Sequence, residues 1–287
     1  MASSITLPSP AKLNLFLHVV GKRPDGYHEL QTLFQFLDYG DTIRFTLTPE
    51  HPGVRLESPI PGVADRDNLV IRAAQTLASI AEHPLPGVTI RIDKRLPMGG
   101  GLGGGSSNAA TTLVGLNWLW QLGLSEEALA EIGLSLGADV PVFVRGQAAF
   151  GEGVGEILTP ANPPEDWFVV LKPDCNINTG KIFSTEGLTR DTAKIKIRPA
   201  FEGDASRYRN DCEDVVRKLY PEVNQSLDWL SQFGPARLTG TGACIFGRFP
   251  TESAARIIWE SKPSGITGFV AKGVNISPLH QKLTELK

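Results

Sequence analysis

The stretch Leu96-Pro97-Met98-Gly99-Gly100-Gly101-Leu102-Gly103-Gly104-Gly105-Ser106-Ser107-Asn108-Ala109 decides how this chain is read. Six of its glycines fall within seven positions. Apolar residues alternate over positions 88–92 before it, which predicts a strand, and residues 109–122 after it have helical spacing. The glycines therefore join a strand to a helix, which we expect to begin near Ser106.

This junction has the chemistry of a phosphate site. Glycine lacks Cβ, so its backbone N–H groups can approach a ligand closely. A helix that begins there adds free N–H groups and the positive end of its dipole. The hydroxyls of Ser106 and Ser107 can bind a phosphate oxygen or a magnesium ion. A flexible linker is a poorer explanation, because it would not lie inside a strand–helix unit.

Two familiar phosphate loops fit less well. A Walker A loop requires a lysine after its last glycine, and none follows here. Gly99, Gly101 and Gly104 satisfy the dinucleotide pattern G-x-G-x-x-G, but any run of glycines does so by chance. That fold also places an acid at the end of the next strand, whereas Glu126 and Glu127 stand at a predicted helix start. An NAD-dependent oxidoreductase is therefore disfavoured, although it stays open.

A second group of polar residues lies near the N-terminus. Apolar residues at positions 13, 15, 17 and 19 alternate with others, which predicts a strand with one face in the core. Lys12 and Asn14 project together from the opposite face. Taken alone, they are either part of a site or an ordinary solvated face.

Three further segments carry candidate functional residues. The turn Arg23–Gly26 is followed directly by Tyr27 and His28. Asp139 stands where a predicted helix gives way to an apolar segment at positions 140–144, which we expect to be a strand. The loop Leu238–Cys244 is built from small residues and precedes another apolar strand. Each segment has an ordinary structural explanation when it is taken alone.

The remaining pattern mixes helices and strands without strict alternation, which favours an α+β fold over a doubly wound one. A helix runs from Asn68 to about Ala81 with Asp67 as its expected N-cap, and Ser125 caps another. Threonine, asparagine and prolines at positions 159–164 predict a linker. We therefore expect an N-terminal nucleotide-binding domain over residues 1–160 and a C-terminal domain over residues 161–287.

Composition restricts the class of partner. The 28 basic and 31 acidic side chains give a net charge of −3, and no basic run is present. A nucleic-acid partner is therefore not expected, and a small molecule is. Three scattered cysteines form no CxxC pair, which argues against disulfides and structural zinc. The N-terminal segment resembles no leader and no stretch could span a bilayer, so a cytoplasmic location is expected.

Taken together, these motifs resemble the GHMP kinases, whose phosphate loop is P-x-x-x-G-L-G-S-S-A. Pro97–Ala109 looks like a longer variant of this loop, with Asn108 where the wider family usually has alanine. The resemblance is strongest to the members that act on a cytidine diphosphate-linked polyol, and it fails over residues 187–207. The matching segments are Ser9–Leu15, Arg23–His28, Gln31–Gln35, Leu96–Asn108, Gly137–Val144, Gly151–Gly155, Leu238–Cys244 and Val274–His280.

The resemblance implies two lobes, one like the second domain of ribosomal protein S5 and one ferredoxin-like, with ATP and substrate between them. It implies Lys12 and Asp139 as the catalytic residues and Mg²⁺ with Ser107 as a ligand. Substrate contacts would come from Asn14, Tyr27, His28, Thr179 and Phe183, with Tyr27 and Phe183 on the two faces of the cytosine. ATP contacts would come from Pro97, Met98, Gly99, Gly100, Gly101, Leu102, Gly103, Gly104, Gly105, Ser106, Ser107, Asn68 and Lys94.

Two alternatives to this function remain. Another GHMP kinase would act on mevalonate or homoserine, and the cytidine pocket at Arg23–His28 and Phe183 argues against it. A nucleotide-binding protein without catalysis would not need both Lys12 and Asp139. The protein is expected to be either a monomer or a homodimer.

Overall fold

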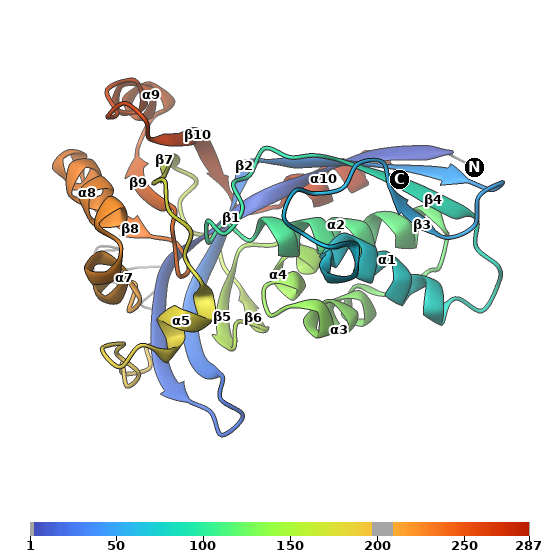
Figure 1. Ribbon diagram of the computed structural model, residues 1–287, viewed down its shortest axis with the longest axis horizontal. Coiled ribbons are helices and arrows are strands. Elements are labelled where there is room, and N and C mark those ends of the chain that lie inside the picture. The colour runs from blue at the N-terminus through green and yellow to red at the C-terminus, as the bar shows by residue number, and fades with distance from the viewer. Residues whose placement is uncertain (1–2, 197–208, 287) are drawn as a thin grey trace.

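The computed structural model describes residues 3–196 and 209–286 and has two lobes (Figure 1). The strands are β1 (Ser4–Lys22), β2 (His28–Thr48), β3 (Val54–Leu56), β4 (Gly87–Asp93), β5 (Ala149–Gly153), β6 (Ile157–Pro160), β7 (Trp167–Lys172), β8 (Ala236–Leu238), β9 (Ile245–Phe249) and β10 (Thr267–Val274). The helices are α1 (Leu69–Ile80), α2 (Gly104–Leu119), α3 (Glu126–Leu136), α4 (Val140–Arg145), α5 (Thr179–Ser184), α7 (Glu213–Leu219), α8 (Pro221–Leu230), α9 (Glu252–Glu260) and α10 (Pro278–Thr284).

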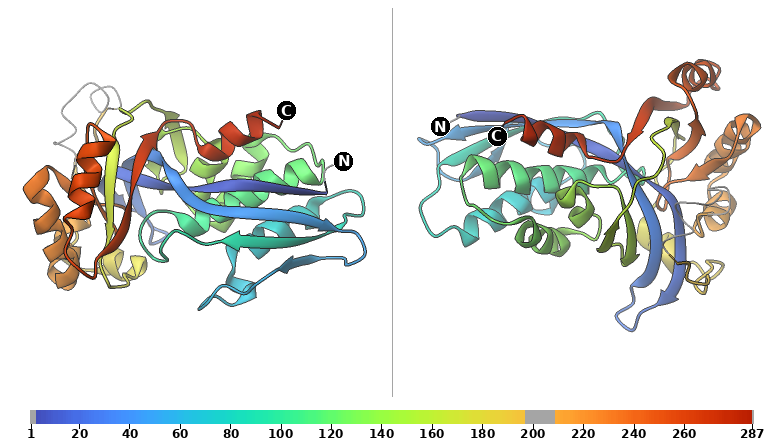
Figure 2. Two further views of the ribbon diagram at one scale, coloured as in Figure 1. Left: turned by 90° about the horizontal axis from the view of Figure 1, so that it is seen from above. Right: turned by 180° about the vertical axis from the view of Figure 1, so that it is seen from behind.

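The long strands β1 and β2 form an antiparallel hairpin that runs through the whole molecule (Figures 1 and 2). Strand β2 also pairs with β4, β5 and β10 along its length. Because β10 pairs in turn with β7, the sheets of the two lobes form one continuous path, β3-β4-β2-β10-β7-β9-β8. One hairpin thus carries polar side chains from its strands to the place where the lobes meet.

The larger lobe packs α1, α2, α3 and α4 against one face of the sheet made by β1, β2, β4 and β3 (Figure 1). Helix α2 packs closely against the sheet at Gly115. A Cβ at this position would come within 2.9 Å of both Leu7 and Phe45. A small residue is therefore needed there, and the close packing fixes where the N-terminus of α2 points.

The smaller lobe packs α7, α8 and α9 with strands β7, β8 and β9, and Leu17 and Val19 of β1 lie in the same core. A third cluster joins the lobes and includes Leu13, Leu102, Phe168 and Phe246. Helix α10 returns to the larger lobe, where Leu279 is part of the core. The domain boundary near residue 160 stays a prediction.

The structure confirms most of the predicted elements and corrects three. Residues 140–144 form helix α4, because an apolar run of this length suits a buried helix as well as a strand, and Pro141 is favoured in a first turn. The N-cap of α1 is Asn68, whose Oδ1 accepts from Val70 N at 2.9 Å, rather than Asp67. Helix α2 begins at Gly104 and ends at Leu119.

The topology also removes the dinucleotide-binding alternative. Among the named strands that the structure describes, only β3 and β4 pair in parallel. A dinucleotide-binding fold needs a central parallel sheet with crossover helices, so the α+β prediction is confirmed. Across residues 3–196 and 209–286, no helix combines the length and apolar character needed to cross a membrane.

Candidate functional site

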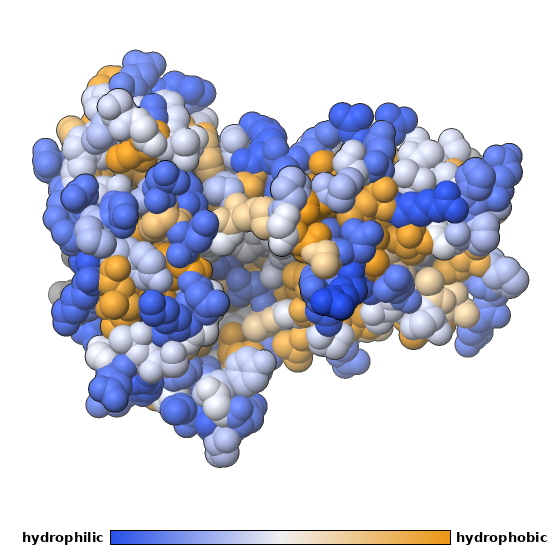
Figure 3. All heavy atoms as spheres, viewed as in Figure 1, coloured by the Kyte–Doolittle hydropathy of each residue, from blue (hydrophilic) through white to orange (hydrophobic). Residues whose placement is uncertain are grey.

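A cleft of about 1050 Å³ lies where the two lobes meet, and it appears as a hollow in the space-filling view (Figure 3). The glycine loop and the polar residues of β1 line it from the larger lobe. The turn before β2, helix α5 and the loop after β8 line it from the other sides. Segments far apart in the sequence therefore share one cavity.

The glycine loop adopts a backbone that other residues rarely take. Gly99, Gly101 and Gly103 have φ values of 63°, 74° and 73°. Gly103 is the residue that precedes α2, and no side chain caps that helix. The first N–H groups of α2 are therefore available to an anion, and the helix dipole favours negative charge at the same point.

The small-residue loop of the smaller lobe holds the glycine loop in place. Ala243 N donates to Gly99 O at 3.3 Å, and Cys244 N donates to Gly100 O at 3.1 Å. A Cβ on Gly101 would lie 2.2 Å from the carbonyl oxygen of Thr239. The two loops thus pack backbone against backbone, which neither sequence motif reveals alone.

We expect Gly101→Ala to destabilise the protein and to weaken ATP binding. Alanine with a left-handed backbone costs about 1–2 kcal/mol, and its Cβ would also collide with the Thr239 carbonyl. Gly99→Ala is the matched control, because Gly99 has a similar φ of 63° but a Cβ added there would meet no atom within 4 Å. Urea unfolding and calorimetry of ATP binding measure both variants. Equal losses in the two would contradict the packing argument.

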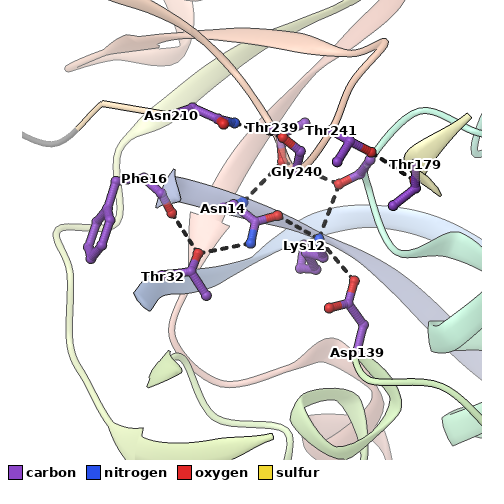
Figure 4. Close-up of polar contacts among 11 residues, drawn as sticks. Lys12, Asn14, Phe16, Thr32, Asp139, Thr179, Asn210, Thr239, Gly240 and Thr241 are labelled. Atoms are coloured by element: carbon purple, nitrogen blue, oxygen red, sulfur yellow. Dashed lines mark hydrogen bonds and ion pairs between the residues drawn. The ribbon is translucent and has the colours of Figure 1, made fainter. Parts of the chain in front are cut away.

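Lys12, Asn14 and Asp139 form the polar centre of the cleft (Figure 4). Lys12 Nζ lies 3.2 Å from Asp139 Oδ2 and donates to Asn14 Oδ1 at 2.6 Å and to Gly101 O at 3.2 Å. The Lys12 side chain is 3% exposed, whereas that of Asp139 is 34% exposed. Although Asp139 precedes α4, its carboxylate makes no cap bond with that helix. It therefore faces Lys12 and the open cleft.

A hydrogen-bond network behind this centre fixes Asn14 (Figure 4). Asn14 Nδ2 donates to Thr32 Oγ1 at 2.9 Å, and Asn14 N donates to Thr239 Oγ1 at 3.0 Å. Thr239 Oγ1 in turn lies 3.3 Å from Gly101 O. Asn210 Nδ2 donates to the carbonyls of Leu238 and Gly240, which supports the same loop. The sequence had assigned no role in the site to Thr32 or Asn210.

Ser107, the predicted magnesium ligand, lies at the buried side of α2, and its role as a ligand stays a prediction. Ser107 is fully buried, and its Oγ lies 2.8 Å from Ser9 Oγ. Ser9 Oγ also lies 2.7 Å from Asn108 Oδ1, which gives a structural role to the asparagine at this position. It is Ser106 that lines the cleft. Helical periodicity explains the difference, because neighbouring positions of α2 face different directions.

Lys94 and Asn68 both line the cleft beside the glycine loop. Lys94 Nζ forms an ion pair with Asp41. The buried Asp41 carboxylate also accepts from the backbone N–H groups of Arg95 and Leu96, at 2.7 and 2.8 Å, and so fixes the chain that enters the loop. Asn68 is buried, and its Nδ2 has no partner among the residues that the structure describes.

The residues predicted to bind cytidine line the same cleft, and their role stays a prediction. The rings of His28 and Phe183 stack on each other, with centroids 5.0 Å apart and an interplanar angle of 24°. Tyr27 is 64% exposed at the cleft edge. Thr179 Oγ1 lies 2.8 Å from Thr241 Oγ1 and borders the same space (Figure 4). Tyr27 and Phe183 therefore line one region, but His28 covers the Phe183 ring.

Arg190 is a cleft residue that sequence reasoning missed. It lies in the poorly matched stretch 187–207, of which residues 197–207 fall outside the described chain. Arg190 Nε donates to His28 Nε2 at 3.1 Å. Burial, with the positive charges of Arg190 and Lys22, lowers the pKa of His28, so we expect it to be neutral at pH 7. No local pattern marks Arg190, because its partner is distant in sequence.

The family model described as "GHMP kinases N terminal domain" matches residues 68–147, and the one described as "GHMP kinases C terminal" matches residues 196–261. A 4-diphosphocytidyl-2-C-methyl-D-erythritol kinase of Marinobacter nauticus is 85% identical over the full length of both chains. The chain belongs to the GHMP kinase family. This GHMP kinase is an ATP-dependent phosphotransferase, and its two-lobed α+β fold is the one that the resemblance implied.

Two solved structures are similar in fold to this GHMP kinase. A 4-(cytidine 5'-diphospho)-2C-methyl-D-erythritol kinase superposes with a TM-score of 0.81 at 31% identity, covering 94% of this chain and 99% of that one. A homoserine kinase from Cytophaga hutchinsonii superposes with a TM-score of 0.70 at 15% identity, covering 96% of each chain. The second likeness extends to the fold alone.

Proposed function

We propose that this GHMP kinase transfers the γ-phosphoryl group of ATP to the carbon-2 hydroxyl of 4-diphosphocytidyl-2-C-methyl-D-erythritol, a step of isoprenoid precursor biosynthesis by the methylerythritol phosphate route. One observation carries the proposal: a phosphate-binding helix end, the Lys12–Asp139 pair and an aromatic pocket share one cleft. The 85% identity to a kinase of that name supports the choice of substrate over mevalonate or homoserine.

The residues at the glycine loop fit a bound nucleotide triphosphate. The uncapped N-terminus of α2 suits the phosphates, and Asn68 Nδ2, which has no partner within residues 3–196 and 209–286, can donate to the nucleotide. Lys94 lies beside the loop. A magnesium ion that arrives with the phosphates needs only one or two protein oxygens, and Ser106 and Asp139 line the cleft with such groups. When bound, Mg²⁺ neutralises charge on the phosphate oxygens.

Asp139 and Lys12 supply the chemistry at the acceptor hydroxyl. A tertiary hydroxyl is a weak nucleophile, and the Asp139 carboxylate accepts its proton as the phosphoryl group transfers. Lys12 Nζ lies 3.2 Å from Asp139 Oδ2 and stabilises the negative charge of that carboxylate. It also neutralises negative charge that develops on the oxygens of the transferred phosphoryl group. Asn14, fixed by Thr32 and Thr239, orients the polyol.

The cytidine end of the substrate binds at the turn before β2 and at α5. Tyr27 and Phe183 stack on the two faces of the base, which requires the base to replace the present His28–Phe183 contact. His28 then contacts the edge of the base, and Thr179 contacts the substrate from α5. The cytidine pocket therefore takes its final shape only when the substrate binds.

A direct assay tests the proposal. Purified protein is mixed with Mg²⁺-ATP and 4-diphosphocytidyl-2-C-methyl-D-erythritol, and ADP release is followed together with the mass of the polyol product. We expect one added phosphate for each ADP released. ADP without a phosphorylated product would indicate another acceptor, and mevalonate and homoserine serve as the comparison substrates.

Replacing Tyr27 with alanine is expected to weaken binding of the cytidine substrate by about 1–3 kcal/mol, the typical value of one stacked base. Because the ring is largely exposed, protein stability and ATP binding should change little. Tyr27→Phe keeps the ring and should retain wild-type affinity. Calorimetric titration with each ligand measures the effect, and equal weakening of both ligands would show that the pocket is misplaced.

We also propose a cytoplasmic location, a monomer or homodimer, and no nucleic-acid partner. Cys175, Cys212 and Cys244 are free thiols, which is compatible with a reducing compartment. The net charge of −3 gives no general attraction for nucleic acid.

A further inference from the structure

The hydroxyl of Thr32 lies behind the polar centre of the cleft and has two buried hydrogen-bond partners (Figure 4). Thr32 Oγ1 donates to the carbonyl oxygen of Phe16 at 2.6 Å and accepts from Asn14 Nδ2 at 2.9 Å. A backbone carbonyl can only accept, so the single hydroxyl hydrogen goes to Phe16. The hydroxyl therefore presents a lone pair to Asn14 and requires a donor there.

Lys12 makes the opposite demand on the same amide. Its ammonium can only donate, and Asn14 Oδ1 accepts from Lys12 Nζ at 2.6 Å. Thr32 needs the amide nitrogen and Lys12 needs the amide oxygen, so one orientation of Asn14 satisfies both. All three side chains are buried, with at most 3% of each residue exposed. A polar group left without its partner at such a site is costly, which holds the amide in this orientation.

The position of Asn14 in turn determines where the Lys12 ammonium points. An ammonium has three hydrogens, and three acceptors surround Lys12 Nζ: Asn14 Oδ1 at 2.6 Å, Gly101 O at 3.2 Å and Asp139 Oδ2 at 3.2 Å. The first two acceptors belong to the packed wall of the cleft, whereas Asp139 is partly exposed to the open cleft. With two N–H groups held by the wall, the third is directed at Asp139.

We propose that Thr32 is a positioning residue for phosphoryl transfer, which acts through Asn14 to hold the Lys12 ammonium against Asp139. The proposal rests on the proposed function, because it requires Lys12 and Asp139 at the reacting hydroxyl. Thr32 also borders the cleft, so a direct contact with the polyol is the competing explanation. The two roles predict different changes in kcat and KM.

Thr32→Val tests this role, because valine has the same shape and lacks the hydroxyl. Asn14 Nδ2 loses its acceptor and the amide is free to turn away from Lys12. We expect kcat to fall by about 10–100-fold, the loss typical of a misplaced reacting group. KM for ATP and for the polyol should stay close to wild type. Thr32→Ser keeps the hydroxyl and should recover most of the activity.

The matched control is Thr46→Val, the same change on the same strand. Thr46 is half-buried and does not line the cleft, so kinetics should not change. A wild-type kcat in Thr32→Val would overturn the positioning role. A higher KM for the polyol at unchanged kcat would also overturn it, in favour of direct contact. A wild-type protein that does not phosphorylate the polyol would refute the proposed function itself, and the positioning role with it.

A double-mutant cycle shows whether Thr32 acts through Lys12. In a Lys12→Met background the ammonium is already absent, so adding Thr32→Val should lower kcat no further. An equal further loss would overturn the proposed route.

A measurement on the wild-type protein covers the case in which Thr32→Val does not fold. We expect nuclear Overhauser effects from the side-chain amide protons of Asn14 to the methyl group of Thr32. Stronger effects to the ε-methylene of Lys12 would show the opposite amide orientation and overturn the proposal.

Discussion

Replacing Asp139 with asparagine should lower the turnover number by about 10²–10⁴-fold, the usual contribution of a positioned general base. Asparagine has almost the same shape, so the cleft and the glycine loop should persist. ATP makes its main contacts with the loop and with α2, and its affinity should therefore stay near the wild-type value. Steady-state kinetics with the cytidine substrate and calorimetry with ATP measure the two effects separately.

The matched control is Asp93→Asn, the same chemical change on the surface. The Asp93 side chain is 55% exposed and forms an ion pair with Arg91 at the end of β4. Exposed pairs of this kind contribute little to stability, so kinetics should not change. Turnover close to wild type in Asp139→Asn would remove Asp139 from the role of base.

Replacing Lys12 with methionine should lower turnover by about 10²–10³-fold, as for other groups that stabilise charge in a transition state. Methionine keeps most of the buried stem but leaves Asp139 without its cation and Gly101 O without one of its donors. The free energy of unfolding should also decrease by about 1–3 kcal/mol, because Asn14 Oδ1 loses its partner in a buried site. ATP binding should stay largely intact.

A double-mutant cycle distinguishes a working pair from two separate contributions. If Lys12 acts through Asp139, the double variant Lys12→Met/Asp139→Asn should lose little more activity than the worse single variant. Additive losses would show that Lys12 acts directly on the phosphoryl group. Lys218→Met, an exposed position on α7, is the control for the charge change.

The sequence could predict the glycine loop and the elements on either side of it, because glycine freedom and short-range periodicity are local properties. It placed Lys12 and Asn14 together on one face of β1, and period two made this inference secure. It could not tell that this face is buried, since Lys12 bonds to the glycine loop and Asn14 bonds to Thr239 of the smaller lobe. Residues 140–144 were assigned to a strand because a short apolar run has no decisive period.

By itself, then, the sequence determined the features that depend on neighbouring residues. These are the phosphate-binding junction between a strand and a helix, the polar face of a strand, and the mixture of helices and strands that indicates an α+β fold. Tertiary structure alone decided which distant side chains meet. In the folded chain Ser107 is buried, whereas Ser106 lines the cleft. Asp41 accepts a hydrogen bond from the backbone at the start of the glycine loop, and Arg190 donates one to His28. The physical reason is that the burial of a side chain and its hydrogen-bond partners depend on contacts between segments far apart in the chain. Local propensity does not predict these contacts.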